Sequence, residues 1–121
     1  MFLKILVIDD DQEILNLIEI ILKEEGHTVF VSTDGAILKT VDKLKPDLIL
    51  LDMVLGHERG TDLCIELKED PATAHIPVVF LSALTSIGDM AEKAGVFAYL
   101  RKPFDIYELL DMVEAVGKRV S

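Results

Sequence analysis

The chain has 121 residues, half of them hydrophobic, which suits one domain with one hydrophobic core. Its 22 acidic residues outnumber its 12 basic residues and give a formal net charge of -10. Surfaces that wrap DNA or bind anionic membranes need clustered Lys and Arg, so this charge argues against both roles. We therefore expect no direct nucleic-acid binding and no membrane contact by this domain.

Cysteine usage and hydropathy favour a cytoplasmic protein. Cys64 is the only cysteine in the sequence, which excludes an internal disulfide, and its apolar neighbours favour a buried thiol over a nucleophile. The sequence has no basic leader followed by a long apolar segment. No stretch approaches the roughly 20 apolar residues of a membrane span. A cytoplasmic location is the expectation.

Along the chain, short apolar runs alternate with helical spacing of apolar residues. Residues 5–8 form an apolar run that stops at three successive aspartates, and a helical pattern follows until Gly26. A second strand is expected over residues 27–32. A second helix is expected over residues 37–44, and Pro46 would stop it.

The second half of the chain continues this alternation. Residues 48–51 form the third apolar run, which ends at Asp52, and residues 56–60 are expected to form a loop before a short third helix around Cys64. A fourth strand, a short fourth helix, a fifth strand and a last helix are expected at residues 78–81, 87–94, 97–100 and 106–116.

Five strands that alternate with five helices predict an α/β fold. Continuous apolar strands are typical of a parallel sheet covered on both faces, and right-handed crossovers place helices on both sides. We therefore predict a doubly wound five-stranded parallel sheet in a single domain spanning residues 1–121. In such sheets the functional site lies beyond the carboxyl ends of the strands, near a switch point in strand order.

Polar side chains stand at the carboxyl ends of four expected strands. They are Asp9 and Asp10 after the first strand, Asp52 after the third, Ser82 after the fourth and Lys102 after the fifth. Three carboxylates and one ammonium leave an excess of two negative charges, which repel at close range. A hard divalent cation such as Mg²⁺, which binds oxygen ligands and keeps several waters, would relieve that repulsion.

The same side chains suit phosphoryl transfer. A carboxylate can act as a nucleophile and form an aspartyl phosphate, while a metal ion, an ammonium and a hydroxyl stabilise the transferred charge. Asp52 is the best nucleophile because it stands alone at the end of a central strand. Asp9 and Asp10 are the better metal ligands. Ser82 and Lys102 would each bind a phosphoryl oxygen.

Each of these residues also has an ordinary interpretation. An Asp after a strand is often a helix cap, and Asp10 or Asp11 could be only the N-cap of the first helix. Ser82 and Lys102, taken alone, could be a loop serine and a surface lysine. The three histidines have no metal-ligand spacing and are expected to face solvent: His27, His57 and His75. The joint placement of the polar residues predicts the site, not any one of them.

Four segments resemble the response-regulator receiver family, and the resemblance covers essentially the whole chain. They match the family's opening strand with its acidic pair, the strand that ends in the phosphoacceptor, the strand with the hydroxyl, and the closing Lys-Pro signature, at residues 5–11, 46–53, 77–83 and 99–104. The resemblance is to chemotaxis-regulator-like receivers, and it implies a (βα)5 flavodoxin-like fold with strand order 2-1-3-4-5.

The resemblance also implies a role for the acidic residues. Asp52 would accept a phosphoryl group from a sensor histidine kinase or a histidine phosphotransfer protein. Asp9, Asp10, Asp52 and the backbone carbonyl of Val54 would bind Mg²⁺. The domain would then catalyse only its own phosphorylation and dephosphorylation, as a phosphoacceptor signalling domain in a two-component system or phosphorelay.

For the remaining residues the resemblance implies a switch. Ser82 and Lys102 would bind the phosphoryl group. Tyr99 would turn inward when Ser82 moves toward that phosphoryl group. The readout would be the face formed by the fourth helix, the fifth strand and the last helix, which could also support a homodimer. The Lys102–Pro103 peptide bond would be cis, which an X-Pro bond allows.

The sequence departs from the family pattern in the loop after the acceptor and around the fourth helix. Gly56 stands where the family commonly has a proline, and the stretch at residues 82–95 is slightly shorter than expected. Val54 and Leu84 follow the acceptor and the serine closely. Because both are apolar and cannot orient a hydrolytic water, we expect a long-lived phosphoryl state.

Other function classes remain open from the sequence. Asp9 and Asp11 fit the spacing of a haloacid-dehalogenase-type phosphatase, but a helix is expected to start directly after them and the chain leaves little room for a cap domain. A receiver-like interaction module that works without phosphorylation is the other alternative, because a fold does not fix a function. A flavodoxin-like FMN binder would need a phosphate loop after the first strand, where the sequence has aspartates.

Overall fold

The structure is a computed structural model, and it describes residues 2–83 and 95–120. In this part of the chain the main sheet contains the strands β1 (Lys4–Ile8), β2 (Thr28–Ser32), β3 (Leu48–Asp52), β6 (Val78–Ser82) and β7 (Ala98–Arg101). Their order is β2-β1-β3-β6-β7, and every neighbouring pair is parallel. The predicted five-stranded parallel sheet and its 2-1-3-4-5 order are confirmed.

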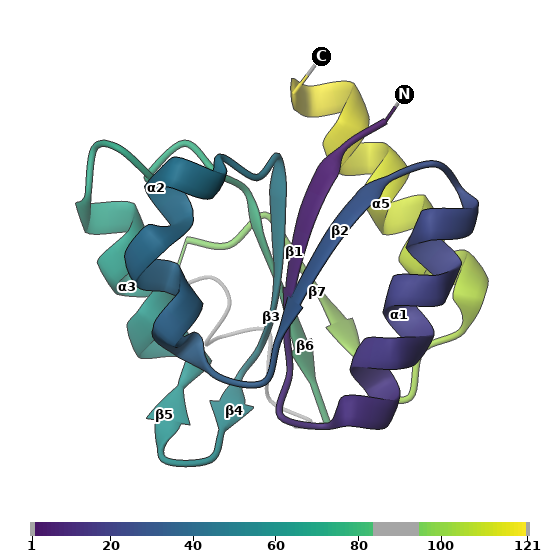
Figure 1. Cartoon of the computed structure of the whole chain (residues 1–121), viewed down its shortest axis with the longest axis horizontal. Helices are drawn as coiled ribbons and strands as arrows, with labels where there is room; N and C mark the ends of the chain where they lie inside the picture. Colours follow the sequence, from purple (N-terminus) through teal and green to yellow (C-terminus); the bar gives the residue numbers. More distant parts are fainter. Residues whose placement is uncertain (1, 84–94, 121) are drawn as a thin grey trace.

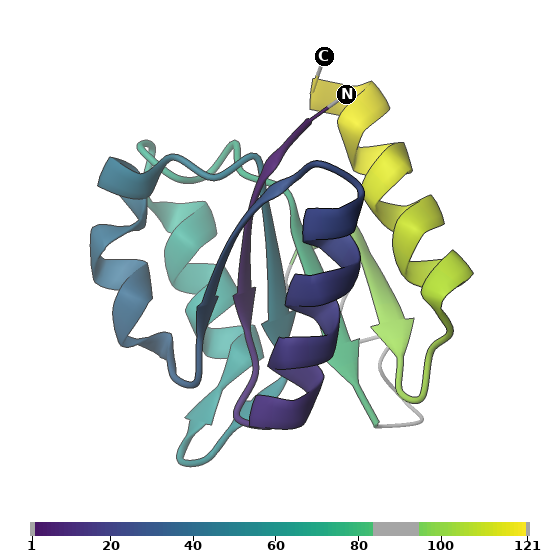
Figure 2. The ribbon, with the colours of Figure 1, turned by 45° about the vertical axis from the view of Figure 1, so that its right-hand side comes forward.

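Helices cover both faces of this sheet, as a doubly wound fold requires. They are α1 (Gln12–Glu24), the 3₁₀ helix η1 (Gly35–Thr40), α2 (Val41–Leu44), α3 (Gly60–Glu69) and α5 (Ile106–Val120). Figure 1 shows α1 and α5 on one face of the sheet and α2 and α3 on the other, and Figure 2 shows the same layers after a turn. The predicted fourth helix, at residues 87–94, lies outside the described residues.

The core has two halves because side chains of each strand alternate between the two faces. On one face, Leu50 and Val79 belong to a buried cluster with Leu15 of α1 and Leu109 of α5. On the other face, buried residues of β3 and β6 cluster with α2 and α3, and Cys64 is fully buried among them. β3 and β6 are buried along their whole length, which holds their carboxyl ends rigidly in place.

Two expectations about local structure were wrong. The predicted helix over residues 37–44 begins earlier, because the Asp34 side chain accepts a hydrogen bond from Ala36 N at 2.8 Å and starts η1. Only the last four residues of this segment are α-helical, and Lys45, with φ at 51°, ends them. Tertiary packing and capping here override helical spacing.

The predicted loop at residues 56–60 is instead part of a short hairpin. β4 (Val54–Leu55) pairs with β5 (Glu58–Arg59) in antiparallel fashion, and α3 begins directly afterwards. Gly56 has a φ of 60°, a conformation that glycine adopts without strain, and this permits the tight turn. The hairpin places a defined structure next to Asp52.

Both chain termini lie at one end of the molecule (Figure 1), opposite the carboxyl ends of the parallel strands and the β4–β5 hairpin. Among the described residues, no helix combines the length and apolar character that a membrane span requires.

Candidate functional site

The predicted polar residues meet at the carboxyl edge of the main sheet. Asp52 and Ser82 are the last residues of β3 and β6, and Asp9 and Lys102 follow β1 and β7 directly. Within the described residues, one group of acidic side chains has the spacing of a metal site: Asp9, Asp10 and Asp52 each offer an oxygen atom within 4.8 Å of the others. Adjacent β1 and β3 bring these carboxylates together.

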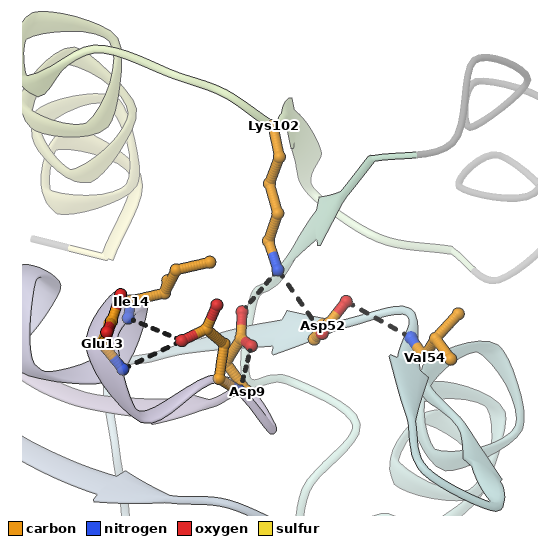
Figure 3. A network of polar contacts seen from close by, with 7 residues as sticks. Asp9, Glu13, Ile14, Asp52, Val54 and Lys102 are labelled. Carbon is orange, nitrogen blue, oxygen red and sulfur yellow. Dashed lines mark hydrogen bonds and ion pairs between the residues drawn. The ribbon is translucent and has the colours of Figure 1, made fainter.

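Asp9 is fully buried and anchors the site (Figure 3). Its Oδ2 accepts a hydrogen bond from Lys102 Nζ at 2.7 Å, and its Oδ1 accepts one from Asp11 N at 2.9 Å. The backbone N of Asp9 donates to Ser32 O at 3.1 Å, which extends the pairing of β1 with β2. A buried carboxylate with this many partners is fixed in position.

The next two aspartates divide the roles that the sequence left open. Asp11 is the N-cap of α1: its Oδ1 accepts hydrogen bonds from Glu13 N at 2.9 Å and from Ile14 N at 3.4 Å. Asp10 is exposed and does not cap the helix. Asp10 is therefore the member of the acidic group with the most freedom to turn toward a ligand.

Lys102 joins the two buried carboxylates. Its Nζ lies 2.7 Å from Asp9 Oδ2 and 3.5 Å from Asp52 Oδ2 (Figure 3). Its backbone N donates to Ser82 O at 2.7 Å, which continues the β6–β7 pairing and aims the side chain along the sheet edge. Burial lowers the pKa of Lys102, but the hydrogen bond to Asp9 and the charge of Asp52 outweigh it, so the pKa is raised.

Asp52 has the strongest electrostatic perturbation of these residues. Burial and then the charge of Asp9 raise the pKa of Asp52 to about 6, against the opposing effects of Lys102 and of the hydrogen bond from Val54 N. The Val54 N–H donates to Asp52 Oδ1 at 3.3 Å. At neutral pH most of the Asp52 carboxyl is thus ionised but incompletely neutralised, which suits a nucleophile or a cation ligand.

The other predicted site residues that the structure describes lie on β4, β6 and β7. Ser82 is buried at the end of β6. It pairs with Arg101 of β7, the residue directly before Lys102. Tyr99 lies on β7 and is 40% exposed, and Val54 is 51% exposed. Leu84, which we expect beside the phosphoryl group, lies outside the described residues. The Lys102–Pro103 peptide bond is cis, as the resemblance implies.

The sequence did not point to Gly60, which the site needs. Gly60 N donates to Met53 O at 2.8 Å, so α3 begins directly against the backbone after Asp52. A Cβ at this position would overlap the carbonyl oxygen of Asp52 and would lie 2.9 Å from Met53 Cα. One sequence alone carries no signal for this role, because a glycine after a strand-ending aspartate reads as an ordinary loop residue.

The three carboxylates present only hard oxygen donors, and one ammonium offsets part of their charge. That donor set fits Mg²⁺, which prefers one or two carboxylates and keeps waters and phosphate oxygens as its other ligands. The arrangement places carboxylates that could act as a nucleophile or hold a metal next to one fixed cation. These are the components that phosphoryl transfer to a carboxylate requires.

Comparison with known proteins agrees with this geometry. The family described as "Response regulator receiver domain" matches residues 5–114. The regulator RpaA of Synechocystis, a DNA-binding transcriptional regulator, is 40% identical over 98% of this chain and 50% of its own length. MtrA of Mycolicibacterium paratuberculosis, a DNA-binding response regulator, is 37% identical over 96% of this chain and 52% of its own.

Among solved structures, the chemotaxis response regulator CheY4 of Vibrio cholerae superposes with a TM-score of 0.88. It is 24% identical in sequence, and the match covers 96% of this chain and 99% of CheY4, which supports the fold alone. The chain spans about half the length of the curated relatives RpaA and MtrA.

Proposed function

This chain belongs to the response regulator receiver family of two-component signalling systems, and from that membership we propose that Asp52 is its phosphoacceptor. The observation that carries the proposal is the bridge from Lys102 Nζ to Asp9 Oδ2 and Asp52 Oδ2, at 2.7 Å and 3.5 Å. It places a fixed cation between a buried acid and a second carboxylate at the centre of the sheet edge. The phosphoryl donor is a histidine kinase or a histidine phosphotransfer protein.

Asp52 is the best nucleophile of the three acids. Asp9 is fully buried and its two oxygens accept short hydrogen bonds, at 2.7 Å and 2.9 Å. Asp52 is 7% exposed and its two oxygens have longer contacts, at 3.3 Å to Val54 N and at 3.5 Å to Lys102 Nζ. An oxygen of the Asp52 carboxylate attacks phosphorus as the P–N bond of the donor phosphohistidine breaks. The bond's electron pair stays with the imidazole nitrogen, which takes up a proton as it leaves.

Asp9, Asp10, Asp52 and the backbone carbonyl of Val54 would hold Mg²⁺. Support comes from the spacing of the three carboxylates, whose oxygen atoms lie within 4.8 Å of one another. When bound, Mg²⁺ supplies positive charge that offsets the oxygens of the transferring group. Lys102 contributes a second positive charge, and the Ser82 hydroxyl would donate a hydrogen bond to a phosphoryl oxygen.

Phosphorylation would act through Ser82 and Tyr99. A phosphoryl group adds about -1.5 to -2 charge and strong hydrogen-bond acceptors. Ser82, buried at the end of β6, would shift toward it and open space for Tyr99, which is now 40% exposed on the neighbouring strand. Binding of the phosphoryl group need only move a pre-existing equilibrium between the two arrangements.

The 121 residues act as one receiver domain in the cytoplasm. The output surface is the face formed by the fourth helix, β7 and α5, which is also where a homodimer would form. The domain catalyses only its own phosphorylation and dephosphorylation, and it does not itself contact nucleic acid. RpaA and MtrA are described as DNA-binding regulators, and that property is not carried over to this chain.

The test is covalent modification. Incubation with acetyl phosphate and Mg²⁺ is expected to add one phosphoryl group to each chain, detected by intact-protein mass spectrometry, and chelation of Mg²⁺ by EDTA is expected to prevent it. Asp52→Asn is expected to remove the modification, while Asp11→Asn, which alters the helix cap, should retain it. Steady turnover of a phosphomonoester would support a phosphatase instead. Absence of any modification would support a phosphorylation-independent interaction module.

A further inference from the structure

The segment from Asp52 to Gly60 is closed into a loop by its own hydrogen bonds. β4 and β5 pair Val54 with Arg59 and Leu55 with Glu58. Gly60 N donates to Met53 O at the base of the hairpin. Because Val54 N also donates to Asp52 Oδ1, any change in the hairpin's direction also moves a hydrogen-bond donor of the acidic site.

Glu58 attaches this hairpin to a distant part of the chain. Its Oε1 accepts a hydrogen bond from the N–H of Gly35 at 3.1 Å, across 23 residues of sequence. Gly35 is buried, and a Cβ there would lie 3.1 Å from both Glu58 carboxylate oxygens and 2.8 Å from Leu63 Cδ1. The absence of a side chain at Gly35 therefore lets the Glu58 carboxylate reach the backbone.

The residues around Gly35 lead back to Asp9. Ser32 Oγ donates to Asp34 O at 2.9 Å, directly before Gly35. Ser32 O in turn accepts the hydrogen bond from Asp9 N at 3.1 Å. The hydrogen bond between Glu58 and Gly35 therefore connects the backbone that carries Asp9 with the hairpin that follows Asp52.

We propose that Glu58 is a positioning residue that holds the β4–β5 hairpin against Gly35 and thereby fixes the backbone of Val54 relative to Asp9 and Asp52. This inference rests on the proposed function, because it concerns the site that would bind Mg²⁺. Glu58 does not touch that site. Residues that orient metal ligands from outside commonly change metal affinity by about tenfold or more when they are removed.

Three variants separate position from charge. Glu58→Ala removes the acceptor of the Gly35 N–H, whereas Glu58→Gln keeps a side-chain oxygen that can accept the same hydrogen bond without the charge. Glu66→Ala removes an equal charge from an exposed residue that lines the same groove between η1 and α3. A purely electrostatic role would make Glu58→Gln resemble Glu58→Ala.

The first measurement is amide hydrogen exchange, detected by NMR. EDTA is present so that no metal is involved. In Glu58→Ala the amides of Gly35, Val54 and Gly60 are expected to exchange faster, while those of β3 and β6 stay protected. Glu58→Gln and Glu66→Ala are expected to match the original protein. Unchanged exchange at Val54 and Gly60 in Glu58→Ala would overturn the inference, whether or not the protein binds Mg²⁺.

The second measurement is Mg²⁺ affinity, by titration of the full chain. Glu58→Ala is expected to bind Mg²⁺ about tenfold more weakly, with Glu58→Gln restoring the affinity. If the original protein binds Mg²⁺ and Glu58→Ala binds it equally well, the inference fails and the proposed function stands. If the original protein does not bind Mg²⁺, the proposed function fails, and exchange alone decides whether Glu58 holds the hairpin.

Discussion

The amino and carboxyl ends of the main sheet both carry aspartate and lysine side chains, but these side chains have different partners. At the amino end, Asp47 Oδ2 accepts a hydrogen bond from Lys4 N at 2.8 Å, and Lys4 Nζ donates to Leu44 O at 3.1 Å. His27 Nδ1 accepts a hydrogen bond from Leu3 N at 3.0 Å. Each of these side chains satisfies backbone groups of the fold itself.

At the carboxyl end, charged side chains face one another. Lys102 Nζ lies between Asp9 and Asp52, and Asp10 adds a third carboxylate nearby. One ammonium cannot neutralise three carboxylates. The same residue types thus have different roles at the two ends. Where their partners are backbone groups, they stabilise the fold, and where an unbalanced negative charge remains, they can bind a ligand.

The largest expected difference between the two ends concerns their lysines. Lys102→Met should slow phosphorylation by acetyl phosphate about 100-fold or more, because a fixed positive charge beside the transferred group is lost. Lys4→Met should leave that rate unchanged and lower the free energy of unfolding by about 1 kcal/mol, because one side-chain hydrogen bond is lost. Mass spectrometry over time and urea unfolding measure the two effects. Equal phosphorylation rates in Lys102→Met and Lys4→Met would contradict the distinction between the two ends.

Next in size is the effect of Asp52 on stability in EDTA. Its pKa is raised from 3.8 to about 6 in the folded protein, so the free energy of unfolding should fall as pH rises from about 4 to about 6. Asp52→Asn removes this loss and should be more stable than the original protein at pH 7.5, by about 1 kcal/mol once solvent screening of this lysine-paired group is allowed for. At pH 4 the difference should nearly vanish. Urea unfolding at both pH values checks this, and a pH-independent difference would contradict it.

A smaller effect is expected on the lifetime of the phosphoryl group. The Val54 side chain is apolar and 51% exposed beside Asp52, so it cannot orient an attacking water. Val54→Asn should therefore speed loss of the phosphoryl group by about tenfold, because it supplies a polar group that positions water. The decay of the phosphorylated protein in Mg²⁺ alone measures this. If even Val54→Asn combined with Leu84→Glu decays at the original rate, the predicted long-lived state has another cause.

The smallest effect is at the amino end and has the opposite sign with pH. Burial lowers the pKa of His27 below 6.5, and only an imidazole with a free Nδ1 can accept the hydrogen bond from Leu3 N. The stability that His27 provides is therefore present above pH 6.5 and is lost as pH falls through the lowered pKa. His27→Gln should cost up to about 1 kcal/mol at pH 7.5 and less at pH 5. His75→Gln, at an exposed histidine, is the control for urea unfolding.

The sequence was informative about the carboxyl edge because the apolar runs and the polar residues that end them are both local patterns. Apolar runs mark the strands, and each run ends at the residue that the parallel sheet brings to that edge: Asp9, Asp52, Ser82 and Lys102. Once the strands are known to be parallel, their ends must meet. The fold and the approach of Lys102 to Asp9 and Asp52 followed from this rule.

What could not be predicted depends on contacts between distant segments. Glu58 meets Gly35 across 23 residues, and His27 meets Leu3 across 24, so neither partner is visible in a local pattern. His27 was expected to face solvent, but it is half-buried. The hairpin after Asp52 was also missed, because two-residue strands have no measurable hydrophobic period.

The position of the two termini has a practical consequence for anyone who labels this protein. Both lie at the end of the molecule away from the acidic site (Figure 1). A fluorescent tag or an immobilisation anchor attached at either terminus would leave the approach to Asp52 unobstructed.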